Sequence, residues 1–101
     1  MLKKINRISR EEEIKEVLNN GKYLHDEFWM RKVIISGDTE RKFLVVVSKK
    51  VAKLAVDRNR MKRLAYEVIR NNFDKLPMGI KMVLLVKKPY EKIGDEIIGG
   101  L

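Results

Sequence analysis

Two apolar runs enclose an amphipathic segment in the second half of the chain, and this arrangement limits the fold more than any other feature. The runs cover residues 43 to 47 and 80 to 86, and each has the length of one buried strand. Between them, from residue 58 to 73, apolar residues recur every three or four positions, the period of a helix with one buried face. The sequence therefore predicts a strand, a helix and a strand, with the helix packed on the sheet.

The first half predicts a helix followed by an extended segment. Ser9-Arg10-Glu11-Glu12 has the form of a capping box, which starts a helix over residues 10 to 20, and Gly21 is a natural stop. Residues 23 to 35 are aromatic and β-branched and predict one strand, with turn chemistry at Ser36-Gly37-Asp38. Asp57 is expected to cap the long helix. A weaker helical segment follows Pro89 and ends near Gly99 and Gly100.

These elements predict one domain over residues 1 to 101. The order α-β-β-α-β-α indicates an α/β (α+β) two-layer sandwich with helices on a mixed sheet. The chain has no cysteine, which fits a reducing compartment, and no apolar run approaches the roughly 20 residues of a membrane-spanning helix. We expect a cytoplasmic protein that does not enter the membrane and is monomeric outside any complex.

Charge is concentrated in the short segment between the first apolar run and the helix. Residues 49 to 63 hold seven cations and one acid, and so carry +6 of the formal +9 of the chain. No acid lies between Arg58 and Tyr66, whereas solvated helix faces usually interleave acids at three or four residues. With Arg58 and Arg60 expected in the first turn, the helix dipole and the side chains would attract the same phosphate. RNA or DNA is therefore the favoured partner over a solvated basic face.

Catalysis by the protein itself has little support in the sequence. The single histidine, His25, would need a serine and a carboxylate from elsewhere to form a nucleophilic triad. No glycine-rich phosphate loop or metal-ligand spacing is present. We therefore expect no catalytic residue and no dedicated protein metal site.

Trp29 and Arg31 offer a second candidate surface. Alternate residues of a strand share a face, so an exposed Trp29 beside Arg31 would combine a stacking ring with a phosphate-binding cation. The alternative is that this tryptophan belongs to the core, and periodicity alone does not decide which face is covered.

The segment Val56-Asp57-Arg58-Asn59-Arg60-Met61-Lys62-Arg63-Leu64 resembles the signature of the bacterial ribonuclease P protein subunit. It is preceded by Val47-Ser48-Lys49-Lys50 and followed by Ile69-Arg70, and the resemblance extends from about residue 3 to 88. It implies a protein that binds a catalytic RNA, which removes the 5′ leader of precursor tRNA with Mg²⁺ held by the RNA and the substrate. It also implies a left-handed crossover between the two apolar strands.

The resemblance also assigns roles to residues. The cations and the asparagine of the signature region would contact the catalytic RNA: Lys49, Lys50, Lys53, Arg58, Asn59, Arg60, Lys62, Arg63 and Arg70. A cleft between the first helix and the sheet would take the single-stranded leader, lined by Ile14, Leu18, Trp29 and Arg31. The family often has aromatic residues at the positions of Ile14, Leu18 and Arg31. The C-terminal helix is also short for the family.

Two other functions fit the basic helix. A ribosome-associated or general single-strand RNA-binding protein would need the same cations, and a stand-alone nuclease would cleave RNA without a partner. Activity that depends on added catalytic RNA, RNA binding without stimulation, and cleavage by the protein alone separate the three.

Overall fold

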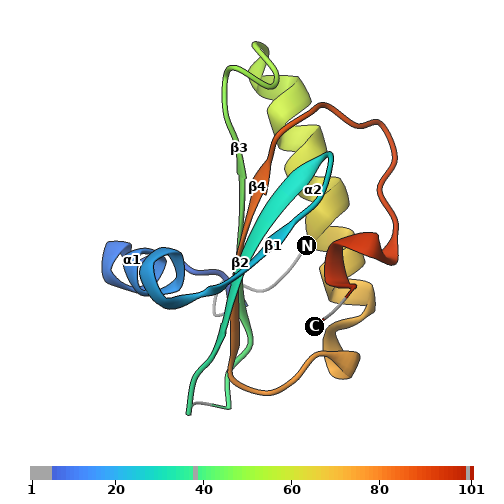
Figure 1. The fold of residues 1–101 in the computed structure, drawn as a ribbon. Helices are drawn as coiled ribbons and strands as arrows, with labels where there is room; N and C mark the ends of the chain where they lie inside the picture. Colours follow the sequence, from blue (N-terminus) through green and yellow to red (C-terminus); the bar gives the residue numbers. More distant parts are fainter. Residues whose placement is uncertain (1–5, 38, 100) are drawn as a thin grey trace.

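The computed structural model describes residues 6–37, 39–99 and 101, and it shows a four-stranded mixed sheet with one long helix on each face (Figure 1). The strands lie in the order β1-β2-β4-β3. Their bounds are β1 Lys22–His25, β2 Trp29–Ile35, β3 Lys42–Val47 and β4 Ile80–Val86. The helices are α1 Glu11–Asn20 and α2 Ala55–Asn71. The predicted α+β class with a mixed sheet is confirmed, but α1 forms a layer of its own opposite α2, so the two-layer description is incomplete.

The two apolar runs form the centre of this sheet. β3 and β4 pair in parallel, from Lys42 opposite Lys81 to Val47 opposite Val86, with α2 as the connection between them. β4 is buried along nearly its whole length because it has a neighbour on each side and a helix on each face. β3 is an edge strand, and its burial alternates along the chain. The handedness of the crossover stays a prediction.

The predicted single strand over residues 23 to 35 is wrong, since the chain folds back within it. β1 and β2 form an antiparallel hairpin in which His25 pairs with Met30. The Asp26 N–H donates to the Trp29 carbonyl at 2.9 Å, and the Asp26 carboxylate accepts from the Glu27 N–H at 2.7 Å. An aspartate that bonds its neighbouring backbone can turn the chain without glycine or proline.

Most of the core lies between α2 and the sheet. Phe43, Met61, Ile69, Met82 and Leu84 are among its fully buried members. On the other face a smaller cluster joins α1 to the sheet through Ile8, Val17 and Val83, with Ile14, Leu18, Ile34, Leu44 and Leu85 partly buried against it. The α2 face therefore supplies most of the hydrophobic stability, while α1 covers only part of the opposite face.

Both helices begin differently from the prediction. α1 starts after Arg10, and its first amides are not capped by a side chain, so the capping box at Ser9 is wrong. Gly21 does end this helix, where its N–H donates to the Val17 carbonyl at 2.8 Å, and a Cβ there would clash with that oxygen. α2 starts after Leu54 rather than at Asp57, which lies within its first turn and makes no cap.

The C-terminal segment has less helix than predicted. Only a 3-10 turn, η3, forms over Asp95–Ile98, and it packs beside α2 (Figure 1). Another 3-10 turn, η2 (Phe73–Lys75), follows α2. Asp38 of the predicted turn and Gly100 lie outside the described residues. Within the described ranges, no helix is long and apolar enough to cross a membrane.

Candidate nucleic-acid interface

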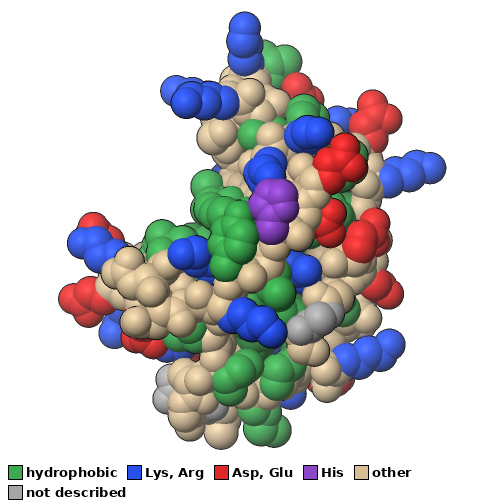
Figure 2. Space-filling model, viewed as in Figure 1, with side chains coloured by type: hydrophobic (Ala, Val, Ile, Leu, Met, Phe, Trp, Pro, Cys, Tyr) green, Lys and Arg blue, Asp and Glu red, His purple; other side chains and the backbone are tan. Residues whose placement is uncertain are grey.

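The cations between β3 and the middle of α2 lie together at one end of the molecule, and we call them the basic patch: Lys49, Lys50, Lys53, Arg58, Arg60, Lys62 and Arg63. Lys49, Lys50 and Lys53 are exposed on the connection that leads into α2. Lysine and arginine side chains project from this end, at the top of Figure 2. The sequence predicted Arg58 and Arg60 in the first turn of the helix, but α2 begins earlier than expected and Arg60 lies in its second turn.

Arg58 has a structural contact that the sequence did not indicate. Its Nη1 donates to the carbonyl oxygens of Ala52 at 3.0 Å and Lys53 at 2.8 Å. The half-buried guanidinium thereby holds the connection against the start of α2. Arg58 contributes positive charge to the basic patch, and it also fixes the shape of the loop that carries Lys53.

One flank of α2 forms a groove with the edge of the sheet. Asn59, Lys62, Arg63 and Tyr66 follow each other at helical spacing and face the segment 7 to 9 and β3 across a cavity of about 460 Å³, which also includes Arg7. The Arg7 guanidinium lies over the Tyr66 ring, 5.2 Å from its centroid. We call this cavity the edge groove. Arg7, three residues before the first predicted helix, is a basic residue of this site that the sequence prediction did not include among the RNA-binding residues.

The walls of the edge groove are held by backbone hydrogen bonds. The Ile8 N–H donates to the Phe43 carbonyl at 2.9 Å, and the Val45 N–H donates to the Tyr66 hydroxyl oxygen at 3.1 Å. These contacts cover the free edge of β3, which would otherwise expose unpaired amides. The groove is therefore a fixed, positively charged depression whose side chains can bind phosphate.

Arg60 and Arg70 lie apart from the edge groove. Arg60 is exposed on the other flank of α2, beside a pocket formed with the loop after β4. Arg70 is ten residues further along, about 15 Å at 1.5 Å per residue, and its Nη2 lies 3.0 Å from the Glu67 carboxylate. That ion pair raises the pKa of Arg70 and lowers the pKa of Glu67. The charge of Arg70 is thus partly compensated, whereas Arg60 forms no ion pair with another residue that the structure describes.

The predicted leader cleft does not form from the four residues assigned to it. Trp29 is buried in the core on the α2 face of the sheet, whereas Ile14 and Leu18 belong to the cluster on the α1 face. Arg31 shares the face of Trp29, and its Nη1 donates to the carbonyl oxygens of Ile97 at 2.8 Å and Gly99 at 2.7 Å. Burial lowers the pKa of Arg31, and the charge of Asp26 opposes this. Trp29 and Arg31 are core residues in this fold.

The sheet face that α1 shares carries other side chains. The hairpin register places Tyr23 opposite Lys32 and His25 opposite Met30, all four on the face turned toward α1. Tyr23 is 50% exposed, and its ring stacks with His25 at a centroid distance of 5.9 Å. In Figure 2 the histidine adjoins hydrophobic side chains on this surface. Strict alternation along residues 23 to 33 would have grouped Tyr23 and His25 with Trp29 and Arg31, because it does not allow for the hairpin turn, so the sequence did not identify this set.

Two lysines bring positive charge to this face. The Lys32 ammonium donates to the Leu18 carbonyl at 2.6 Å, at the C-terminal turn of α1, where the helix dipole favours a cation. The Lys87 ammonium lies 2.5 Å from Nε2 of His25. We call the set Tyr23, His25, Met30, Lys32 and Lys87 the α1-side surface. It combines an exposed aromatic pair with two cations, the composition of a single-strand binding site.

Groups able to catalyse or to bind metal are scarce around both surfaces. Within residues 6–37, 39–99 and 101, no three histidine, cysteine or acidic side chains gather at metal-binding distance. His25 stacks with Tyr23 and lies beside the Lys87 ammonium, and neither of these two partners is the carboxylate of a triad. The cations and aromatic rings of the two surfaces have the chemistry of a binding site for an anionic polymer.

Comparisons with known proteins show which sequences and which folds this chain resembles. The Ribonuclease P family model matches residues 2–98. A ribonuclease P protein component of Pseudanabaena sp. (strain PCC 6903) is 34% identical over 103 residues, covering 96% of this chain and 89% of that protein. The ribonuclease P protein of Thermotoga maritima superposes with a TM-score of 0.72 at 26% identity, covering 81% and 74% of the two chains. The ribonuclease P protein of Staphylococcus aureus superposes with a TM-score of 0.77 at 20% identity, covering 94% of this chain and 86% of that protein.

Proposed function

The chain belongs to the ribonuclease P protein family and is a ribonuclease P component, and from this premise we propose that the basic patch and the edge groove bind the catalytic RNA of that enzyme. The observation that carries the proposal is the grouping of seven patch cations with a single acid, Asp57, at the start of α2. Uncompensated cations repel one another, and a phosphate backbone removes that cost while releasing its own counterions.

The edge groove indicates how an RNA strand would lie on the protein. Lys62 and Arg63 line it from α2 and Arg7 from the opposite wall, so a phosphate strand lying along the groove would meet cations on both sides. Asn59 adds an amide that can donate to phosphate or to a base edge. Lys49, Lys50 and Lys53 then extend the positive surface beyond the end of the groove.

We assign the 5′ leader of precursor tRNA to the α1-side surface instead of Trp29 and Arg31. Single strands bind where bases stack on aromatic rings and cations meet the phosphates. Tyr23 and His25 provide the rings, and Lys32 and Lys87 provide the charge. Ile14 and Leu18 pack against the same face of the sheet from α1, which supports including them in the proposed site.

In this function the protein contributes contacts and the RNA contributes the reaction. The Mg²⁺ ions would be held by the catalytic RNA and the substrate, and the protein would act in the cytoplasm as one copy in each complex. The positive surface would also reduce repulsion between the two RNAs, and thereby help them to assemble with metal ions.

Reconstitution with the catalytic RNA tests the proposal. Arg60→Ala and Arg63→Ala should each lower the slope of log affinity against log salt by about one unit, because each removes about one phosphate contact. Lys75→Ala, an exposed cation on η2 at the far end of α2, is the matched control and should leave the slope unchanged. An unchanged slope in the Arg60/Arg63 double variant would refute the assignment.

Processing of precursor tRNA separates the remaining functions. Cleavage that appears only with the catalytic RNA supports the proposal, RNA binding without stimulation indicates a general RNA-binding protein, and cleavage by the protein alone indicates a nuclease. His25→Ala should leave the single-turnover cleavage step within a few-fold of wild type at saturating enzyme, since loss of a general acid or base costs roughly 100-fold or more.

A further inference from the structure

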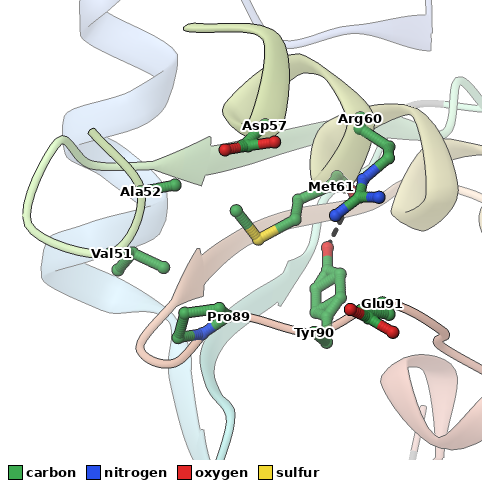
Figure 3. Close-up of a pocket in the computed structure, with 8 residues that line it drawn as sticks. All are labelled: Val51, Ala52, Asp57, Arg60, Met61, Pro89, Tyr90 and Glu91. Atoms are coloured by element: carbon green, nitrogen blue, oxygen red, sulfur yellow. Dashed lines mark hydrogen bonds between the residues drawn. The ribbon is translucent and has the colours of Figure 1, made fainter. Parts of the chain in front are cut away.

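We propose that the pocket between α2 and the loop after β4 receives an unpaired guanine base of the bound RNA (Figure 3). The inference rests on the proposed RNA-binding function and names a specific contact within it. The pocket has a volume of about 420 Å³, within the roughly 300–1,000 Å³ typical of small-molecule sites. It is lined by two backbone segments and one helix flank: Val51, Ala52, Asp57, Arg60, Met61, Pro89, Tyr90 and Glu91.

The walls of the pocket are fixed in the protein alone. The Tyr90 hydroxyl, in a residue only 8% exposed, donates to the Met61 carbonyl at 2.7 Å and ties the loop after β4 to α2. On the other side Arg58 holds the Ala52 carbonyl at 3.0 Å. A pocket whose walls are already in place loses little entropy when a ligand binds, so a weak ligand such as one base can occupy it.

The pocket offers apolar side chains on one part of its surface and charges on another. Val51 and Pro89 provide aliphatic contacts against which the flat face of a base can pack, and Met61, only 2% exposed, also lines the pocket. Figure 3 shows Arg60 and Glu91 near the ring of Tyr90, with Asp57 on the α2 side of the pocket. A ligand here needs an apolar face together with polar edges, which describes a nucleobase on an RNA strand.

Asp57 and Glu91, the two carboxylates that line the pocket, determine which base binds there. Neither Asp57 nor Glu91 forms an ion pair among the described residues, although both stand within or beside the basic patch. Next to phosphate a free carboxylate is repelled, so its favourable use is to accept hydrogen bonds from base donors. Guanine presents two adjacent donors, N1–H and the N2 amino group, which match the two oxygens of one carboxylate. The other bases offer fewer donors side by side, and Arg60 is placed to bind the adjoining phosphate.

Nuclear magnetic resonance of the full chain with short RNA tests this assignment. The probes are four pentaribonucleotides, uridine throughout except for guanine, adenine, cytosine or uracil at the centre. The guanine pentamer should shift the methyl signals of Val51 and Met61 and bind about tenfold or more tightly than the others, as good bidentate base contacts discriminate by roughly 5- to 150-fold. Equal affinity for the four pentamers, or no shift at these methyls, would overturn the proposal.

A charge-matched pair of variants isolates the carboxylates. Asp57→Asn with Glu91→Gln should lower the affinity for the guanine pentamer to the level of the other three, whose own affinities should rise slightly because two negative charges are lost. Glu12→Gln with Glu16→Gln makes the same charge change on exposed positions of α1 and should keep the guanine preference. A preference that survives in the first variant would contradict the role of these acids. If the wild-type chain binds the catalytic RNA but prefers no pentamer, only the pocket assignment fails; if it binds neither, the proposed function fails as well.

Discussion

Replacing Trp29 and Tyr23 separately by alanine should separate stability from leader binding, because the two rings lie on opposite faces of the sheet. Trp29 is 4% exposed and packs in the core with α2, whereas Tyr23 is 50% exposed on the α1-side surface. A buried aromatic side chain removes roughly 200 Å² from water, worth about 5 kcal/mol at 25 cal/mol per Å². A compact unfolded chain reduces this, so Trp29→Ala should lower the free energy of unfolding by about 3–5 kcal/mol.

The expected result for Tyr23→Ala is the reverse. Its half-exposed ring and its stacking with His25 should contribute only about 1 kcal/mol to stability. Loss of one base-stacking ring costs about 1–3 kcal/mol of binding, which corresponds to about 5- to 150-fold in affinity. That loss should be confined to precursor tRNA with a leader, and mature tRNA should bind as before.

Urea denaturation of the protein and affinity measurements on the reconstituted enzyme check both expectations. Tyr23→Phe keeps the ring and should retain most of the leader-dependent affinity. Ile35→Ala removes an exposed apolar side chain at the far end of β2 and is a control for surface truncation. A stable Trp29→Ala protein with selective loss of leader binding would refute the assignment of the two faces, and so would a Tyr23→Ala protein with unchanged leader affinity.

Three further predictions concern stability. Burial raises the pKa of Tyr90 to about 12, so above pH 10 the folded chain keeps a proton that the unfolded chain has lost. The free energy of unfolding should therefore fall by up to about 1.4 kcal/mol per pH unit between pH 10 and 12. The fall should be less steep in Tyr90→Phe, which has no hydroxyl to ionise. Partial burial of Glu13 opposes its ionisation, but Lys42 and Lys81 outweigh this effect and lower its pKa. In urea denaturation, the free energy of unfolding of wild type should therefore exceed that of Glu13→Gln by its full amount above pH 4.5, and the difference should decline below that pH. Arg31→Leu leaves two carbonyl groups without a donor and should cost about 1–3 kcal/mol, with faster hydrogen exchange in η3.

The parts of the fold that the sequence predicts best are those with strong periodicity. Residues 80 to 86 form β4 with the predicted bounds, and Phe43 to Val47 lie within β3, because a buried parallel strand needs an apolar side chain at nearly every position. The hairpin between Tyr23 and Ile35 was missed because its turn uses Asp26 in place of glycine or proline. Local composition therefore predicts strands well and predicts where they reverse poorly.

The sequence predicted where the positive charge of the RNA-binding site lies, but not how the side chains of the site are arranged. The signature at Arg58 to Arg63 locates the basic patch, but only the structure shows that Arg58 bonds backbone carbonyls while Lys62 and Arg63 line a groove with Arg7. Along β2, Trp29 and Met30 point to opposite faces of the sheet, but the alternation does not tell which of the two faces is buried. The choice depends on which helix covers which face, and that is a tertiary property.

Unequal coverage of the two sheet faces explains how a small domain can both fold and bind RNA. The α2 face is closed by α2 and by η3, with Arg31 joining the sheet to the last turn, so nearly all of its side chains contribute to stability. The α1 face is only partly covered, which leaves Tyr23 accessible without removing a core residue. The cations of the basic patch lie on the connection before α2 and on the exposed sides of α2, whereas the buried face of this helix is mainly apolar. Substitutions in the binding surfaces should therefore alter RNA affinity with little change in unfolding, and core substitutions should do the opposite.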